Sequence, residues 1–137
     1  TEGHLIADEL GKEQIRAVIG PVISDRSKPE LANQTIKLAQ KLFAAGVELA
    51  ICTDHPEVPI QYLPLSAALC VRGGLDYDYA LRAITINAAE ISGISDRVGS
   101  LKVGKDADFV LFDGDPLDVQ QCPKLVVING EIVRDNR

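Results

Sequence analysis

The feature that most constrains this chain is a short apolar run, residues 47–52, which lies between a helical pattern and a proline-containing loop. The run has the length and composition of a strand buried on both faces. Pro56 and Pro59 follow it and end any strand, because proline lacks an amide donor and fixes its own φ. Asp54 and His55 therefore lie where a buried strand passes into a loop, and ligands and catalytic groups gather at such places in parallel α/β sheets and barrels.

Asp54 has two interpretations at this position. A carboxylate at the end of a rigid strand can bind a metal ion or accept a proton from a reacting group. An aspartate can equally cap the next helix or turn, because its side chain accepts hydrogen bonds from nearby backbone amides. The surrounding residues leave both roles open.

The segments before this strand indicate an α/β order. Residues 3–10 predict a short helix that ends before Gly11, and the β-branched residues 15–19 predict a strand. Residues 29–45 have apolar side chains at spacings of three and four and end at Gly46, which predicts an amphipathic helix. A helix between two strands is the usual connection of a parallel pair.

The segments after the strand continue this order. Residues 61–72 predict one helix, and a second begins at Asp76, a good N-cap, and extends to Ile86, with a further helical turn over residues 88–92. The order α-β-α-β-α-α is typical of a parallel α/β sheet with right-handed crossovers.

The C-terminal segment has a different pattern, which predicts β-strands. Residues 108–113 are typical of a strand, and residues 125–134 predict two strands around an Asn-Gly turn, a strong hairpin signal. We therefore divide the chain into an α/β part, residues 1–98, and a β part, residues 99–137.

Composition argues against several classes of protein. The chain has 137 residues, 46% of them hydrophobic, and a net charge of −6, so it is typical of one globular domain that binds neither nucleic acid nor a membrane surface. Cys52, Cys70 and Cys122 lack the spacing of a disulfide framework or a cysteine zinc site, and no run approaches the roughly 18 apolar residues of a membrane span. We expect a cytoplasmic protein. The chain begins at Thr1 and contains no methionine, which suggests a fragment of a longer protein.

Three blocks along the chain resemble one protein family. They are residues 85–90 (TINAAE), 97–110 (RVGSLKVGKDADFV) and 127–133 (VINGEIV). In this order they resemble the C-terminal end of the amidohydrolase superfamily, in particular the imidazolonepropionase-related amidohydrolases. The resemblance implies the C-terminal part of a metal-dependent-hydrolase (β/α)8 TIM barrel, about strands 6–8 with their helices, followed by strands of a small composite β-sandwich.

The resemblance also implies roles for individual residues. The segment from Thr53 to Pro56 is similar to the family's motif after the eighth barrel strand, so Asp54 is expected to bind the metal and to accept a proton from the attacking water. His4 lies in a segment similar to that after the sixth strand and is a candidate metal ligand, with a simple helix-start histidine as the alternative. His55 is a candidate substrate contact or a solvated loop residue, and Asn87 is expected to bond backbone near the strand ends.

By the same resemblance, the parent protein is a hydrolase that acts on carbon–nitrogen bonds other than peptide bonds, in a cyclic amide-like substrate, with a divalent metal, zinc in particular. A catalytic metal needs about three protein ligands. This chain has two histidines and no HxH pair, so we expect it to be inactive alone, with a metal site that is incomplete or absent.

The expected partners are a small-molecule substrate, the N-terminal remainder of the same protein and further copies of the chain. Open strand edges invite association, which favours a homo-oligomer. The alternative function is a non-catalytic amidohydrolase-like protein or module that serves in an oligomeric assembly.

Overall fold

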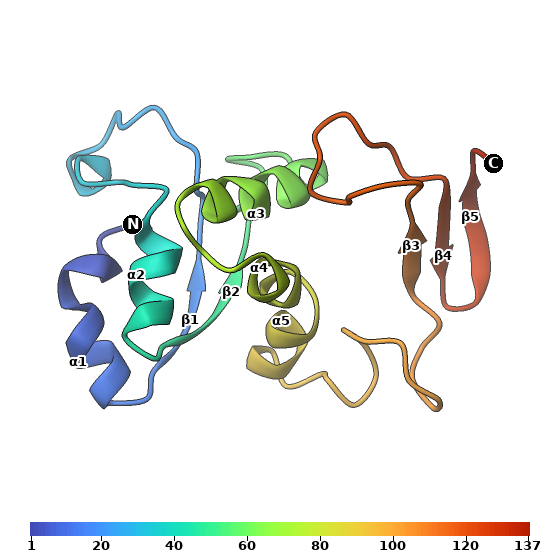
Figure 1. The fold of residues 1–137 in the computed structure, drawn as a ribbon, viewed down its shortest axis with the longest axis horizontal. Coiled ribbons are helices and arrows are strands. Elements are labelled where there is room, and N and C mark those ends of the chain that lie inside the picture. The colour runs from blue at the N-terminus through green and yellow to red at the C-terminus, as the bar shows by residue number, and fades with distance from the viewer.

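Two parallel strands form the centre of the α/β part of this protein (Figure 1). The structure is a computed structural model that describes residues 1–137. Strand β1 (Arg16–Ile19) pairs with β2 (Glu48–Ile51), and Arg16 lies opposite Glu48 at the start of the pair. The parallel pairing predicted from the α/β order is confirmed. The two strands do not form a closed barrel, and only they precede residue 98.

Short helices surround these strands and connect them. They are η1 (Gly3–Ile6), α1 (Ala7–Lys12), η2 (Pro29–Leu31), α2 (Leu38–Ala44), η3 (Ile60–Tyr62), α3 (Leu63–Arg72), α4 (Tyr77–Ala83) and α5 (Ile86–Ile91). The predicted N-cap of α4 is confirmed, because the Asp76 carboxylate accepts a hydrogen bond of 2.8 Å from the Tyr79 amide. None of the helices combines the length and the hydrophobicity that a membrane crossing needs.

Two predicted helices are interrupted in the structure. The helix expected over residues 29–45 is interrupted between η2 and α2, where the buried Gln34 bonds the loop after β1 instead: its Nε2 donates to the Pro21 carbonyl oxygen at 2.9 Å. The helix expected from Asp76 to Ile86 breaks at Thr85, which leaves helical geometry with φ −132° and ψ −100°.

The end of α1 also differs from the prediction. The helix continues through Gly11 to Lys12 instead of ending before the glycine. A side chain at Gly11 would place its Cβ 1.9 Å from the carbonyl oxygen of Ala45, at the end of α2. Gly11 therefore serves close packing of two helix ends rather than helix termination.

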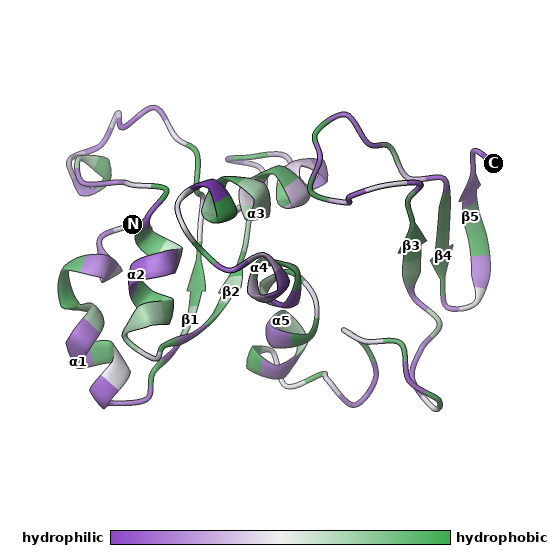
Figure 2. Cartoon of the chain, viewed as in Figure 1, coloured by the Kyte–Doolittle hydropathy of each residue, from purple (hydrophilic) through white to green (hydrophobic).

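The hydrophobic core lies between the two strands and the helices that follow them. Val47, Leu49 and Ile51 are almost fully buried there, together with Leu42 of α2 and Cys70 of α3. Figure 2 shows β1 and β2 drawn mostly in the colour of hydrophobic residues. The burial of β2 on both faces confirms the interpretation of residues 47–52 as a core strand.

A separate antiparallel sheet forms the β part, at the opposite end of the molecule from α1 (Figure 1). Its strands are β3 (Phe109–Leu111), β4 (Leu125–Ile128) and β5 (Glu131–Asp135), in the order β3-β4-β5. The predicted Asn-Gly hairpin is confirmed: Asn129 and Gly130 have φ values of 51° and 80°, which this tight turn requires.

A loop between β3 and β4 attaches the β part to the α/β part. Leu117, which is 8% exposed, is the member of the main core cluster that comes from the β part; the other members lie between Ile19 and Ala83. Beside it, the Tyr77 hydroxyl at the start of α4 donates a 2.5 Å hydrogen bond to the Asp115 carboxylate. This bond is the main cause that raises the pKa of Tyr77 to about 12 and lowers the pKa of Asp115.

Candidate functional site

The carboxyl ends of β1 and β2 lie at one edge of the sheet, because the strands are parallel and in register. The last ladder bond joins the Cys52 amide to the Ile19 carbonyl oxygen at 2.9 Å. The next residue after β1 is Gly20, and a Cβ built on it would lie 2.2 Å from the Cys52 carbonyl oxygen. The two exit loops therefore touch through their backbones at the point where both strands end.

Asp54 lies in a tight turn just beyond this contact. It has φ +55°, in the left-handed region that aspartate tolerates better than most residues. Its carbonyl oxygen accepts a 2.9 Å hydrogen bond from the Glu57 amide, while the residue itself is exposed. The preceding residue, Thr53, is 5% exposed, so the exposed turn begins directly after a buried residue.

Capping of the next helix does not explain Asp54. The N-cap of η3 is Pro59, and no side chain caps that helix. The turn is closed by backbone carbonyls, those of Asp54 and Thr53, the latter accepting from the Val58 amide at 3.3 Å. The Asp54 carboxylate is thus presented at the strand end without a role in closing the local structure.

The two histidines differ in environment. His55 is exposed in the same turn as Asp54. His4 lies in η1 and is partly buried, and its Nδ1 is enclosed without a hydrogen-bond partner. No group of three or more histidine, cysteine, aspartate or glutamate side chains is close enough to hold a metal ion. The donors of this chain therefore do not make a metal site by themselves, and the roles predicted for Asp54, His55 and His4 stay predictions.

Asn87 bonds backbone, as predicted, but in the middle of β2 rather than near the strand ends. It is 1% exposed, and its Nδ2 donates to the Leu49 carbonyl oxygen at 3.4 Å. The Tyr79 hydroxyl accepts from the Leu49 amide at 3.1 Å. These two side chains from α5 and α4 therefore hold the middle of β2, and Asn87 belongs to the support of the strand rather than to its exposed end.

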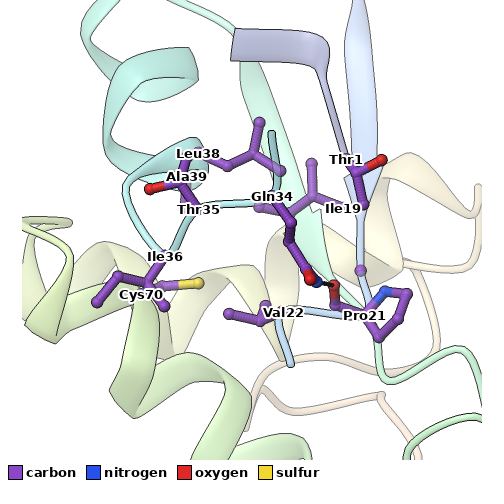
Figure 3. Close-up of a pocket in the computed structure, with 11 residues that line it drawn as sticks. Thr1, Ile19, Pro21, Val22, Gln34, Thr35, Ile36, Leu38, Ala39 and Cys70 are labelled. Atoms are coloured by element: carbon purple, nitrogen blue, oxygen red, sulfur yellow. Dashed lines mark hydrogen bonds between the residues drawn. The ribbon is translucent and has the colours of Figure 1, made fainter. Parts of the chain in front are cut away.

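A small cavity lies between the loop after β1 and the start of α2 (Figure 3). Its volume is about 10 Å³, room for about one water molecule. Figure 3 shows Gln34 extending toward Pro21 beside it. The Gln34 amide is already bonded to Pro21 and to Ser24, so this cavity is part of the packing of the loop and is too small for a substrate.

A much larger groove separates the helices α4 and α5 from the sheet of the β part. Its volume is about 870 Å³, and hydrophobic side chains dominate its lining. They include Ile84, Ala88, Leu101, Val110, Leu117 and Ile128. None of the three candidate site residues, Asp54, His55 and His4, lines this groove, so the apolar surface and the strand-end turn are different places on the molecule.

Sequence reasoning missed Gly20 as a residue of the strand-end site. The sequence predicts a strand over residues 15–19 and assigns no role to the glycine that follows it. The close approach of Gly20 to Cys52 joins positions 32 residues apart, and no local pattern reports such a contact.

Comparison with known proteins identifies the family. The sequence model of the amidohydrolase family matches residues 9–133, and the chain therefore belongs to this family. It is 35% identical over 103 residues to the amidohydrolase tasK of Hapsidospora irregularis, and this alignment covers 75% of this chain and 10% of that protein. It is 44% identical over 78 residues to an imidazolonepropionase of Geobacillus sp. (strain WCH70), and this alignment covers 55% of this chain and 18% of that enzyme.

Solved structures agree with this assignment. An amidohydrolase from Thermotoga maritima MSB8 superposes with a TM-score of 0.93 at 36% identity, over 98% of this chain and 35% of that one. An adenosine deaminase from Xanthomonas campestris with bound zinc gives a TM-score of 0.63 at 26% identity, over 100% of this chain and 35% of that one. The chain thus spans about a third or less of the length of these relatives.

Proposed function

We propose that this chain is the C-terminal part of a metal-dependent amidohydrolase that hydrolyses a carbon–nitrogen bond in a cyclic amide-like substrate. Membership of the amidohydrolase family supports a hydrolase of C–N bonds, and the similarity to an imidazolonepropionase supports the class of substrate. The observation that carries the proposal is the exposed carboxylate of Asp54, held in a left-handed turn at the carboxyl end of a buried strand.

In this proposal Asp54 works as the general base. Hydrolysis of an amide-like bond needs a water molecule that is nucleophilic at neutral pH and a group that accepts its proton. The Asp54 carboxylate takes that proton and returns it to the leaving nitrogen. A divalent metal, zinc in the family, lowers the pKa of a bound water to about 7.

At least one ligand of such a metal must come from outside residues 1–137, because this chain brings no three suitable side chains together. Within the proposal, Asp54 contributes one ligand and His4 a second, through the enclosed Nδ1 that has no partner in this chain. His55 lies in the same turn as Asp54, and its proposed role is to contact the substrate.

The partner of this chain in the proposal is the N-terminal remainder of the same protein. The large apolar groove and the outer edges of the two-stranded sheet are the surfaces that this polypeptide would cover. Copies of the chain that meet through the same edges would form a homo-oligomer.

A second candidate function is a non-catalytic amidohydrolase-like module. The observation that favours it is the missing group of three metal-binding side chains. The two functions differ in whether metal and turnover depend on Asp54, so one substitution distinguishes them.

The experiment uses the intact amidohydrolase, which we define as the polypeptide that carries residues 1–137 together with its remaining family domain. Asp54→Asn keeps the size of the side chain and removes its basicity. We expect turnover of a panel of cyclic amides and imides to fall by about 10²–10⁴-fold, the usual effect of losing a general base. Glu57→Gln, in the same exposed turn, is the matched control and should retain activity. Wild-type turnover in Asp54→Asn would refute the proposed role.

A further inference from the structure

We propose that Gly20 is a positioning residue for the strand-end site. Its missing side chain lets the exit of β1 lie directly against the backbone of Cys52, and this contact sets the place of the turn that presents Asp54. The inference rests on the proposed function of Asp54 but concerns a different residue, on a different strand, whose role can be measured separately.

The contact leaves no room for a side chain. A Cβ on Gly20 would lie 2.2 Å from the carbonyl oxygen of Cys52 and 2.7 Å from its Sγ, and real Cβ atoms do not approach other atoms within 3.0 Å. The obstacle is mainly a backbone oxygen, which cannot rotate away as a flexible side chain can. A substitution therefore has to separate the two strand exits by about 1 Å, which is the scale of misplacement that lowers catalysis.

The displacement would reach Asp54 through a short and constrained path. Cys52 is bonded to Ile19 by the last rung of the ladder, and the buried Thr53 joins it to Asp54. The Thr53 carbonyl oxygen accepts a hydrogen bond from the Val58 amide, so the residue after the turn is also held by Thr53. A movement of the Cys52 carbonyl therefore changes the turn as a unit.

The same chain offers a matched control at the opposite end of the strands. Gly11 lies at the end of α1, and a Cβ there would lie 1.9 Å from the backbone oxygen of Ala45. These two residues precede β1 and β2, whereas Gly20 and Cys52 follow them. Gly11→Ala thus creates a clash with a backbone oxygen away from Asp54, at a position that lacks the positive φ (+157°) of Gly20.

The test compares Gly20→Ala with Gly11→Ala in the intact amidohydrolase. We expect Gly20→Ala to lower kcat by about 100-fold with little change in KM, since a misplaced base affects the chemical step more than binding. Hydrogen exchange of peptides that cover residues 52–58 should rise in Gly20→Ala and stay unchanged in Gly11→Ala. Equal losses of kcat in the two variants, or unchanged exchange over residues 52–58 in Gly20→Ala, would overturn the inference.

Cys52→Ala provides a second arm if Gly20→Ala does not fold. This variant removes the Sγ and keeps the backbone contact, so kcat should stay near that of the wild type. A loss of about 100-fold in Cys52→Ala would show that the sulfur, and not the backbone contact with Gly20, positions the turn. Failure of the proposed function has another signature: turnover would survive Asp54→Asn, while Gly20→Ala would still raise exchange over residues 52–58.

Discussion

Leu117 is expected to decide whether the β part stays attached to the α/β part. This side chain comes from the loop between β3 and β4 and is 8% exposed in a core whose other members lie between Ile19 and Ala83. The substitution Leu117→Ala removes the buried side chain and keeps the loop. It tests the structure without reference to catalysis.

The magnitude follows from burial and from the surroundings of the side chain. A buried Leu→Ala substitution costs about 2–5 kcal/mol, and the cost depends on how well the site can relax. Leu117 also lines the open groove of about 870 Å³, so water or neighbouring side chains can fill part of the space. We therefore expect a loss of about 2–3 kcal/mol in the free energy of unfolding.

The assay is urea unfolding followed by circular dichroism, with hydrogen exchange measured for β3, β4 and β5. Val119→Ala is the matched control, because this residue lies two positions away in the same loop and is 78% exposed. It should change the free energy of unfolding by less than about 0.5 kcal/mol, as surface substitutions usually do. Equal effects of the two substitutions would refute the assignment of Leu117 as the attachment point.

Two further predictions concern ionisation. The hydrogen bond from Tyr77 lowers the pKa of Asp115, so it stabilises the fold above the usual carboxyl range and is lost as pH falls through the lowered pKa. Tyr77→Phe should raise the pKa of Asp115 in an NMR titration and make stability less sensitive to acid; an unchanged pKa would contradict this cause. Burial raises the pKa of Cys70 to about 12, whereas Cys122 is exposed. Alkylation at pH 8, followed by mass spectrometry, should modify Cys122 and spare Cys70 until urea unfolds the protein; rapid modification of Cys70 in the native protein would contradict its burial.

Local features of the fold could be predicted from the sequence because their causes are local. The apolar run at residues 47–52, the N-cap at Asp76 and the Asn-Gly hairpin each depend on a few neighbouring residues, and the structure has all three. The predictions differed where a distant partner competed with local preference. Gln34 lies outside a helix and donates a hydrogen bond to Pro21. Gly11 does not end its helix but allows close contact with Ala45.

The candidate site divides in the same way. Three short blocks in order were enough to identify the family from the sequence, and the apolar run at residues 47–52 predicted that Asp54 lies just beyond a buried strand. Only the tertiary structure showed the left-handed turn of Asp54, the contact between Gly20 and Cys52, and the docking of Leu117 in the core. The physical reason is that hydrogen-bond capacity, proline and hydrophobic periodicity act over a few residues, whereas close packing joins segments far apart in the chain and is fixed only when the strands and helices meet.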